Sequence, residues 1–163
     1  MTAETHLQMV RSASARGKKS PANPRGSRGG GDCKQPPSAQ LLLGIREFNC
    51  GAYFACHETL EKLWVGDKRP FRRFYQGILQ VAAALLHLER GNYRGAVRLL
   101  TKGAGHLALF TPRCRRVDVA GLLRETESLR KELESLGPER FREWDRNLAP
   151  RVRLPDNASR QNP

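Results

Sequence analysis

The stretch FYQGILQVAAALLHL, residues 74–88, decides the fold of this chain of 163 residues. It contains no charged residue, although 28% of the whole chain is charged. It is shorter than the roughly 20 apolar residues that a membrane-spanning helix needs, and it includes glutamine, glycine and histidine. With about 100° between successive residues, its apolar side chains cover more than half of a helix circumference. The stretch therefore predicts a helix of a soluble domain that other helices surround on most sides.

Apolar residues are dense only from Leu41 to Leu148, which predicts one helical domain over residues 39–148 with a tail at each end. We expect a disordered basic arm over residues 1–38, where Arg, Lys, Ser, Gly and Pro dominate, and a flexible tail over 149–163. Glycine and proline breaks predict helices over about 39–50, 52–65, 70–89 and 93–110, and further helices over 117–147. No segment alternates as a strand does, so the fold class is all-α, a small bundle of five to six antiparallel helices.

The last long helix carries a narrow apolar seam at spacings of three and four residues. Its members are Val119, Leu122, Thr126, Leu129, Leu133 and Leu136. Such a seam is typical of a helix that lies on a bundle. We leave open that the seam of helix 117–136 instead meets a protein partner or a second copy of the chain.

The net charge of +13 is typical of a protein with an anionic partner, either nucleic acid or an anionic membrane. No nucleic-acid-binding motif accompanies this charge, so a solvated basic surface is the preferred interpretation and nucleic acid the weaker one. The start of the chain lacks the apolar core of a secretory signal, and no segment reads as a transmembrane helix. The four cysteines of the chain form no C-x-x-C pair and indicate no disulfide framework. We therefore expect a reducing compartment and a cytoplasmic location.

Three polar residues fall at unexpected positions of the second helix. His57, Glu58 and Glu61 form H-E-x-x-E, and projection places His57 and Glu61 inside a broad apolar sector, with Glu58 at its edge. In the third helix, Gln76, Gln80 and His87 share one side. If that side packs against His57 and Glu61, a polar cluster forms within the bundle, and Trp64 lies one turn beyond Glu61.

The cluster has three interpretations. The first is preferred for the residues themselves, whereas the second, a binding module, is the best guess for the function of the chain. In the first, the polar side chains satisfy one another and fix the register of the helices. In the second, they line a pocket for a small polar ligand or a divalent metal ion, with His57, Glu61 and His87 as the metal ligands. In the third, Glu58 or Glu61 serves as the base of a metal-assisted hydrolase, although no nucleophile or complete ligand set is visible.

Two segments carry a resemblance to a known family. FNCGAYFACHETLEKLW (48–64) and FYQGILQVAAALLHLERGNYRGAVRLL (74–100) closely resemble the bacterial domain of unknown function 309 family, over about residues 41–110. The resemblance implies a small all-α fold of packed antiparallel helices, and it supplies no activity, substrate or cofactor. The family's characteristic positions fall here on His57, Glu58, Glu61, Trp64, Gln76, Gly77, Gln80 and His87. Relatives often have acidic residues where this chain has Ala52 and Ala55, so the resemblance disfavours a two-metal site.

Overall fold

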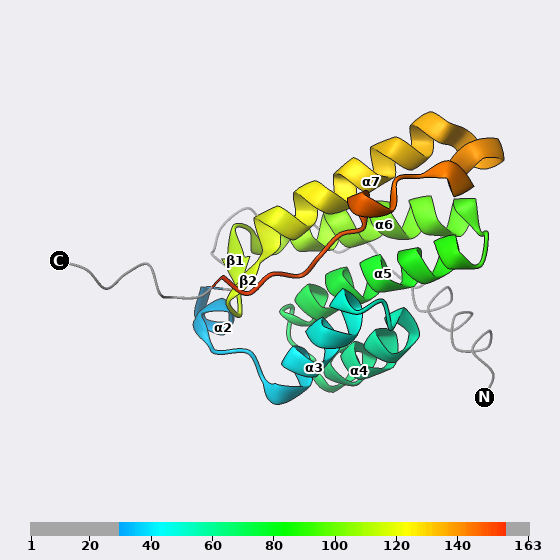
Figure 1. Ribbon diagram of the computed structural model, residues 1–163. Coiled ribbons are helices and arrows are strands. Elements are labelled where there is room, and N and C mark those ends of the chain that lie inside the picture. Colours follow the sequence, from blue (N-terminus) through cyan, green and yellow to red (C-terminus); the bar gives the residue numbers. More distant parts are fainter. Residues whose placement is uncertain (1–29, 156–163) are drawn as a thin grey trace.

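The computed structural model describes residues 30–155 and confirms the all-α fold class (Figure 1). Over these residues there are six α-helices, namely α2 (Gly30–Lys34), α3 (Ala39–Asn49), α4 (Tyr53–Gly66), α5 (Arg72–Glu89), α6 (Tyr93–Leu107) and α7 (Val119–Arg140). Three 3-10 helices accompany them, η1 (Ala108–Phe110), η2 (Phe141–Glu143) and η3 (Arg146–Leu148). Two short strands, β1 (Arg113–Cys114) and β2 (Val117–Asp118), form an antiparallel hairpin. The predicted arm before residue 30 and the tail after residue 155 lie outside the described residues.

Three helices begin at side-chain caps. Ser38 Oγ accepts a hydrogen bond from the amide of Leu41 at 3.2 Å, and Asp118 Oδ1 accepts one from Gly121 at 3.0 Å. Asn92 Oδ1 does the same for Gly95 at 2.9 Å. Each cap satisfies a backbone donor that the first turn of a helix leaves without an intrahelical partner, which fixes where the helix begins.

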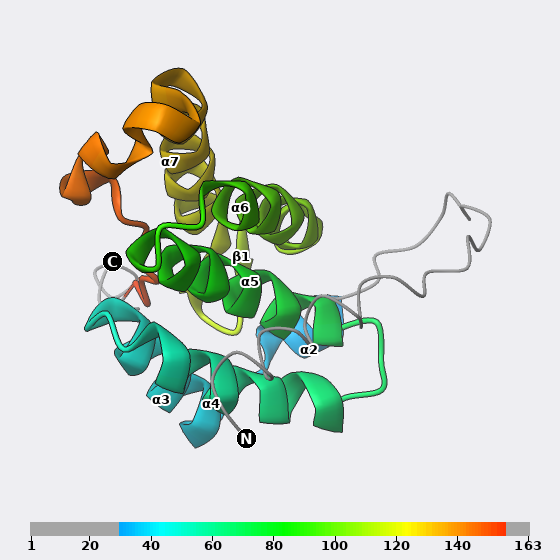
Figure 2. The same ribbon diagram turned by 90° about the vertical axis from the view of Figure 1, so that its right-hand side faces the viewer.

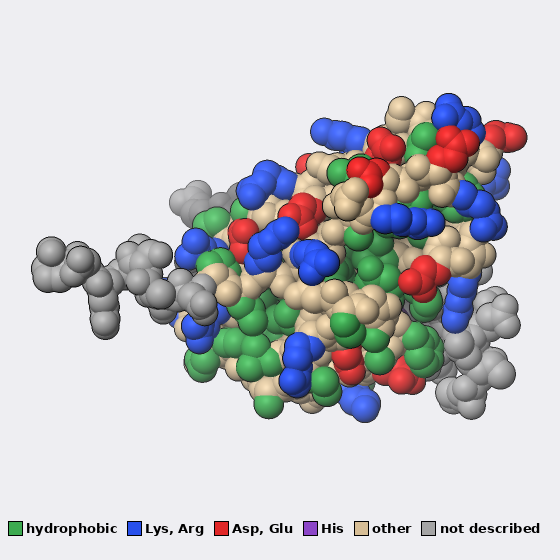
Figure 3. Space-filling model, viewed as in Figure 1, with side chains coloured by type: hydrophobic (Ala, Val, Ile, Leu, Met, Phe, Trp, Pro, Cys, Tyr) green, Lys and Arg blue, Asp and Glu red, His purple; other side chains and the backbone are tan. Residues whose placement is uncertain are grey.

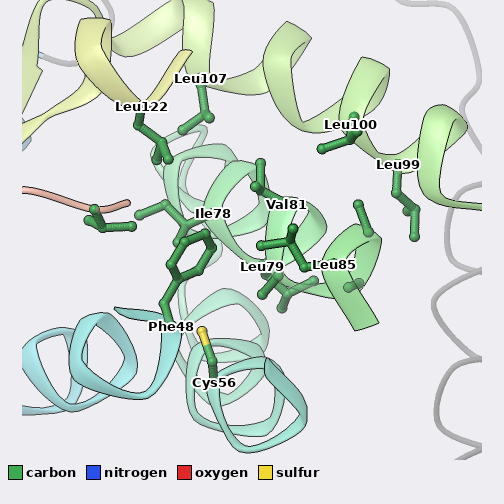
Figure 4. Packing of buried hydrophobic residues seen from close by; sticks show 14 of the residues in the cluster. Phe48, Cys56, Ile78, Leu79, Val81, Leu85, Leu99, Leu100, Leu107 and Leu122 are labelled. Carbon is green, nitrogen blue, oxygen red and sulfur yellow. The ribbon is translucent and has the colours of Figure 1, made fainter. Parts of the chain in front are cut away.

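Helix α5 lies at the centre of the molecule, between the α3–α4 pair and α6 with α7 (Figure 2). Every residue from Gly77 to Leu88 is buried, as the uncharged stretch predicts. Figure 4 shows the core that results, with Phe48 from α3, Cys56 from α4 and Leu122 from α7 pointing toward α5. The central position of α5 explains its composition, because a helix covered on most sides has no face for charged residues.

Helices α5 and α6 approach closely at two glycines. A Cβ atom on Gly103 would lie 3.1 Å from the backbone oxygen of Gly77 and 3.0 Å from Cγ2 of Val81. A Cβ atom on Gly77 would lie 2.9 Å from Cγ of Leu107. These glycines have helical backbone angles, so the contact between the two helices, and not the turn geometry, is what excludes a side chain.

The seam of α7 faces the interior of the domain. Five members of the seam are fully buried, namely Val119, Leu122, Thr126, Leu129 and Leu133. Helix α7 packs chiefly on α6. The idea that this seam meets a partner or a second copy is therefore wrong, because α6 already covers it. The helix is interrupted at Gly137, whose φ of 71° and ψ of 178° lie outside the helical range, and Pro138 follows it.

The expectation of no disulfide is also wrong. Cys33 of α2 and Cys114 of β1 form a disulfide between residues 81 positions apart, while Cys50 and Cys56 are free. The amide of Arg115 donates to the carbonyl of Cys33 at 2.8 Å, so α2 and the hairpin are also joined by their backbones. The cysteine argument thus no longer supports a reducing compartment, and the cytoplasmic location stays a prediction.

Residues 149–155, which the sequence assigns to a flexible tail, run back along the bundle. Val152 is 2% exposed, and the side chain of Asn49 bonds both its amide and its carbonyl, at 2.9 and 2.8 Å. The amide of Asp118 donates to the carbonyl of Arg153 at 2.9 Å. These contacts join the end of α3, the start of α7 and the C-terminal segment. Over residues 30–155, none of the helices is both long enough and apolar enough to cross a bilayer.

Candidate functional site

The three polar residues of α4 differ in burial much as their projection predicts. His57 is 1% exposed, Glu61 is half-buried and Glu58 is exposed. Glu58 therefore lies on the solvent side of α4, outside any interior cluster. The free cysteine beside His57 has no role as a nucleophile, because burial raises the pKa of the Cys56 thiol to about 12 and keeps it protonated.

The two glutamines of α5 also differ in burial. Gln80 is 3% exposed, and its Oε1 atom has no hydrogen-bond donor among the described residues. Gln76 is half-buried. Trp64 is half-buried at the other end of the predicted cluster, where the Arg72 guanidinium lies 4.8 Å from its ring centroid. Trp64 thus packs under a cation at the start of α5.

His87 is buried and contacts the turn into α6. Its Nδ1 lies 2.8 Å from Nδ2 of Asn92, whose Oδ1 already accepts from the Gly95 amide. An amide nitrogen donates, so Nδ1 accepts and the proton of the neutral ring is on Nε2. A Cβ on Gly95 would lie 2.8 Å from His87 Nδ1, so the missing side chain leaves room for this contact. His87 therefore helps to fix how α6 begins.

The proposed metal trio of His57, Glu61 and His87 finds no support. Over residues 30–155 no group of three or more His, Cys, Asp or Glu side chains has the arrangement that could hold a metal ion. The role of the buried polar residues as a ligand site stays a prediction.

A pocket that the sequence analysis missed lies where α5 ends. It has a volume of about 500 Å³, and we call it the Trp144 pocket. Its lining residues are Tyr53, Leu85, Leu88, Glu89, Arg142, Trp144, Arg146 and Ala149. One wall comes from the start of α4 and the end of α5, and the other from η2, η3 and the residues around them. In Figure 1 this is the end of the bundle where the orange segment meets the end of α5.

The second wall of the pocket carries two arginines. The Arg146 guanidinium lies 4.3 Å from the ring centroid of Trp144, and Arg142 lies 5.6 Å from the Phe141 ring. Neither guanidinium forms an ion pair or a side-chain hydrogen bond with any residue of the described part of the chain. Stacking on an aromatic face occupies the plane of a guanidinium and leaves its N–H groups for an anion.

The position of Arg142 depends on two neighbours. The ring of Phe141 packs on Tyr93 of α6, with 5.6 Å between centroids, which fixes η2 on the bundle. A Cβ on Gly91 would lie 2.2 Å from Nη2 of Arg142, and Gly91 has a φ of 73°. Glycine at residue 91 therefore allows the positive φ of the turn between α5 and α6, and its missing side chain leaves the space that Arg142 occupies.

The first wall of the pocket is apolar with a polar edge. Leu85 and Leu88 are buried and Glu89 is exposed. Burial, and then the nearby carboxylate of Glu89, raise the pKa of Tyr53, so its phenol is protonated at neutral pH. The pocket thus combines an apolar floor, two guanidinium groups, one phenol and one carboxylate.

Comparison with known proteins gives a family match for part of the chain and no activity. Residues 41–99 match the model of a domain of unknown function, DUF309. The uncharacterized protein YpuF of Bacillus subtilis (strain 168) is 38% identical over 71 residues, which are 43% of this chain and 39% of YpuF. The matched part thus spans about two fifths of that relative. No solved structure matches the chain.

Proposed function

With residues 41–99 identified as a DUF309 domain, as the resemblance predicts, we propose that this chain is a binding module for a small molecule that carries an anionic group on an apolar body. The ligand occupies the Trp144 pocket. Its apolar body lies against Leu85 and Leu88, and its carboxylate or phosphate meets Arg142 and Arg146.

One observation carries the proposal: two guanidinium groups line a pocket with an apolar floor and have no carboxylate partner among the described residues. The one acidic residue of the lining, Glu89, belongs to the opposite wall. Charge-assisted bonds to a guanidinium are about twice as strong as neutral ones, and the aromatic side chains exclude water from one side of the pocket. The volume of about 500 Å³ is within the usual range of small-molecule sites.

The family segment supplies only half of this pocket. Tyr53, Leu85, Leu88 and Glu89 lie within residues 41–99, whereas both arginines and Trp144 lie beyond them. We infer that the anion preference belongs to this chain's own C-terminal part, and the apolar floor to the family domain.

The alternative is that the polar residues have only a structural role and the domain acts through protein contacts. The contact of His87 with Asn92 favours a structural role for that histidine. The weaker alternative, metal-assisted hydrolysis, has no such observation, because its metal ligands do not form a group over residues 30–155.

The test uses the fluorescence of Trp144. The chain has two tryptophans, so Trp64→Phe leaves Trp144 as the sole reporter. In that background 4-phenylbutyrate and phenyl phosphate should change the emission with saturation, and bind at least about tenfold more tightly than neutral 4-phenylbutanol. Arg142→Gln with Arg146→Gln should remove the preference for the anions.

Arg140→Gln is the matched control. Arg140 is on the same segment and exposed, but it pairs with Glu143 and does not line the pocket. This variant should bind as the parent does. If the alcohol binds as well as the anions, or if the double variant keeps the preference, the proposal is wrong.

A further inference from the structure

A concentration of cations lies at the opposite end of α5 from the Trp144 pocket. We call it the basic end and define it by Lys68, Arg69, Arg72, Arg73, Arg113 and Arg116. The 18 residues of α5 separate it from the pocket by about 27 Å at the usual helical rise. The start of α5, the end of α4 and the β1–β2 hairpin meet there, at the left of Figure 1, and Lys and Arg side chains are visible at that end in Figure 3.

Ring contacts show that these segments lie side by side. The guanidinium groups of Arg69 and Arg115 both lie over the ring of Phe71, at 5.9 and 4.9 Å from its centroid. Arg115 and Arg116 form the turn of the hairpin, with φ values of 51° and 64°. The hairpin thus presents its arginines next to those of the loop before α5.

Few acidic groups oppose this charge. Asp32 and Asp67 both pair with Arg69, at 2.5 and 2.8 Å. Of the basic end, Arg69 alone has a carboxylate within ion-pair distance in residues 30–155. Lys68, Arg73, Arg113 and Arg116 are exposed, so their charges face solvent.

The N-terminal sequence adds charge of the same sign. Residues 1–29 contain six Lys or Arg and one acidic residue, Glu4. They precede α2, which the disulfide and the Arg115 amide join to the hairpin at the basic end. Helix α2, where the described residues begin, therefore lies at the basic end.

We propose that the basic end binds the phosphate backbone of nucleic acid. Five of its six cations are arginine, whose planar fork of donors fits phosphate oxygens in pairs. The cations are distributed over a loop, a helix start and a hairpin, which suits a chain of regularly repeated charges. An anionic membrane is the competing partner, since Val65 and Leu109 are large apolar residues exposed near this end, at 49% and 60%. These two are isolated apolar side chains among many cations, so the surface favours the phosphate backbone.

The test is the anisotropy of fluorescein-labelled single- and double-stranded DNA, and of RNA, each of about 20 nucleotides, with the full chain. Affinity should fall at least about tenfold between about 50 and 200 mM salt, because bound cations release counterions. Arg73→Gln, Arg113→Gln and Arg116→Gln together should reduce the slope of log affinity against log salt by about 2 to 3.

The matched control changes three arginines elsewhere. Arg90, Arg94 and Arg98 are exposed near and within the first half of α6 and have no ion pair with a described residue. Their triple Gln variant has the same charge change and should keep the parent's slope. Equal slopes for the two triple variants would overturn the proposal. So would binding to vesicles with about 30% phosphatidylserine but not to any of the nucleic acids.

Discussion

Gly103→Ala tests the close approach of α5 and α6. The added Cβ would lie 3.1 Å from the backbone oxygen of Gly77 and 3.0 Å from Cγ2 of Val81. Both distances are shorter than an ordinary carbon contact, and a backbone oxygen inside a helix cannot move alone. The two helices must therefore separate by a few tenths of an ångström, and the core between them loses contact.

Two opposing terms set the size of the effect. Overpacking of this kind costs about 1–3 kcal/mol, whereas replacing a helical glycine by alanine gains about 0.5–1 kcal/mol. Gly105→Ala isolates the second term, because Gly105 is on the same helix, is exposed and has no atom within 4 Å of the added Cβ. We expect Gly105→Ala to raise the free energy of unfolding, and Gly103→Ala to fall below it by about 1–3 kcal/mol.

Urea denaturation followed by helical circular dichroism measures both variants against the parent. Both variants replace a helical glycine by alanine, so most of the gain in helix propensity cancels when their free energies of unfolding are compared. If Gly103→Ala is as stable as Gly105→Ala, the helices do not approach closely at this position and the packing described for the core is incorrect.

Three further predictions concern the fold. Reduction should lower the free energy of unfolding by about 2–4 kcal/mol, because the disulfide closes a long loop, whereas Cys33→Ser should not respond to the reductant. The denatured parent should titrate two thiols before reduction and all four cysteines after it, and four thiols before reduction would contradict the disulfide. Burial, and then Arg73 and Lys102, lower the pKa of His106 in the folded chain. As the pH falls, the unfolded chain therefore binds a proton at His106 before the folded chain does. Stability should therefore be complete above the unfolded value of about 6.5 and be lost as the pH falls below it, and His106→Gln should lose less between about pH 7 and 5. An equal loss in both proteins would refute the assignment. Asn92→Ala removes the cap of α6 and the contact to His87, and thermal unfolding should report a loss of about 1–2 kcal/mol, whereas an unchanged midpoint would show that the cap contributes nothing.

Local sequence signals were sufficient to predict where the helices lie and which of their faces are buried. Ser38, Asn92 and Asp118 mark helix starts by side-chain chemistry that acts within one turn. The absence of charge in residues 74–88 predicts the central position of α5, because only a surrounded helix has no need of a polar face.

Contacts between distant segments could not be predicted in this way. Cys33 and Cys114 are 81 residues apart and belong to no recognisable spacing, so only the fold brings them together. The projection of α5 puts Gln76, Gln80 and His87 on one side of the helix, and in the structure Gln80 and His87 are buried while Gln76 is half-buried. It does not show that His87 contacts the turn at Asn92, because that turn lies beyond the helix.

The Trp144 pocket was missed for the same reason. Phe141 and Trp144 are visible in the sequence as apolar residues of a last short helix, and the arginines beside them look like ordinary surface charge. These residues line a pocket only because the chain after Gly137 brings η2 and η3 against the end of α5. A pair of arginines flanking an aromatic residue was the one signal available.

The proposed anion site is tested most directly by nuclear magnetic resonance of the ¹⁵N-labelled protein during titration with 4-phenylbutyrate. The indole signal of Trp144 and the Nε–H signals of Arg142 and Arg146 should shift together and saturate at one affinity. The indole of Trp64 and the Nε–H of Arg72, at the opposite end of α5, should stay in place. Saturable shifts at Trp64 and Arg72, or no saturable shift at Trp144, would contradict the site.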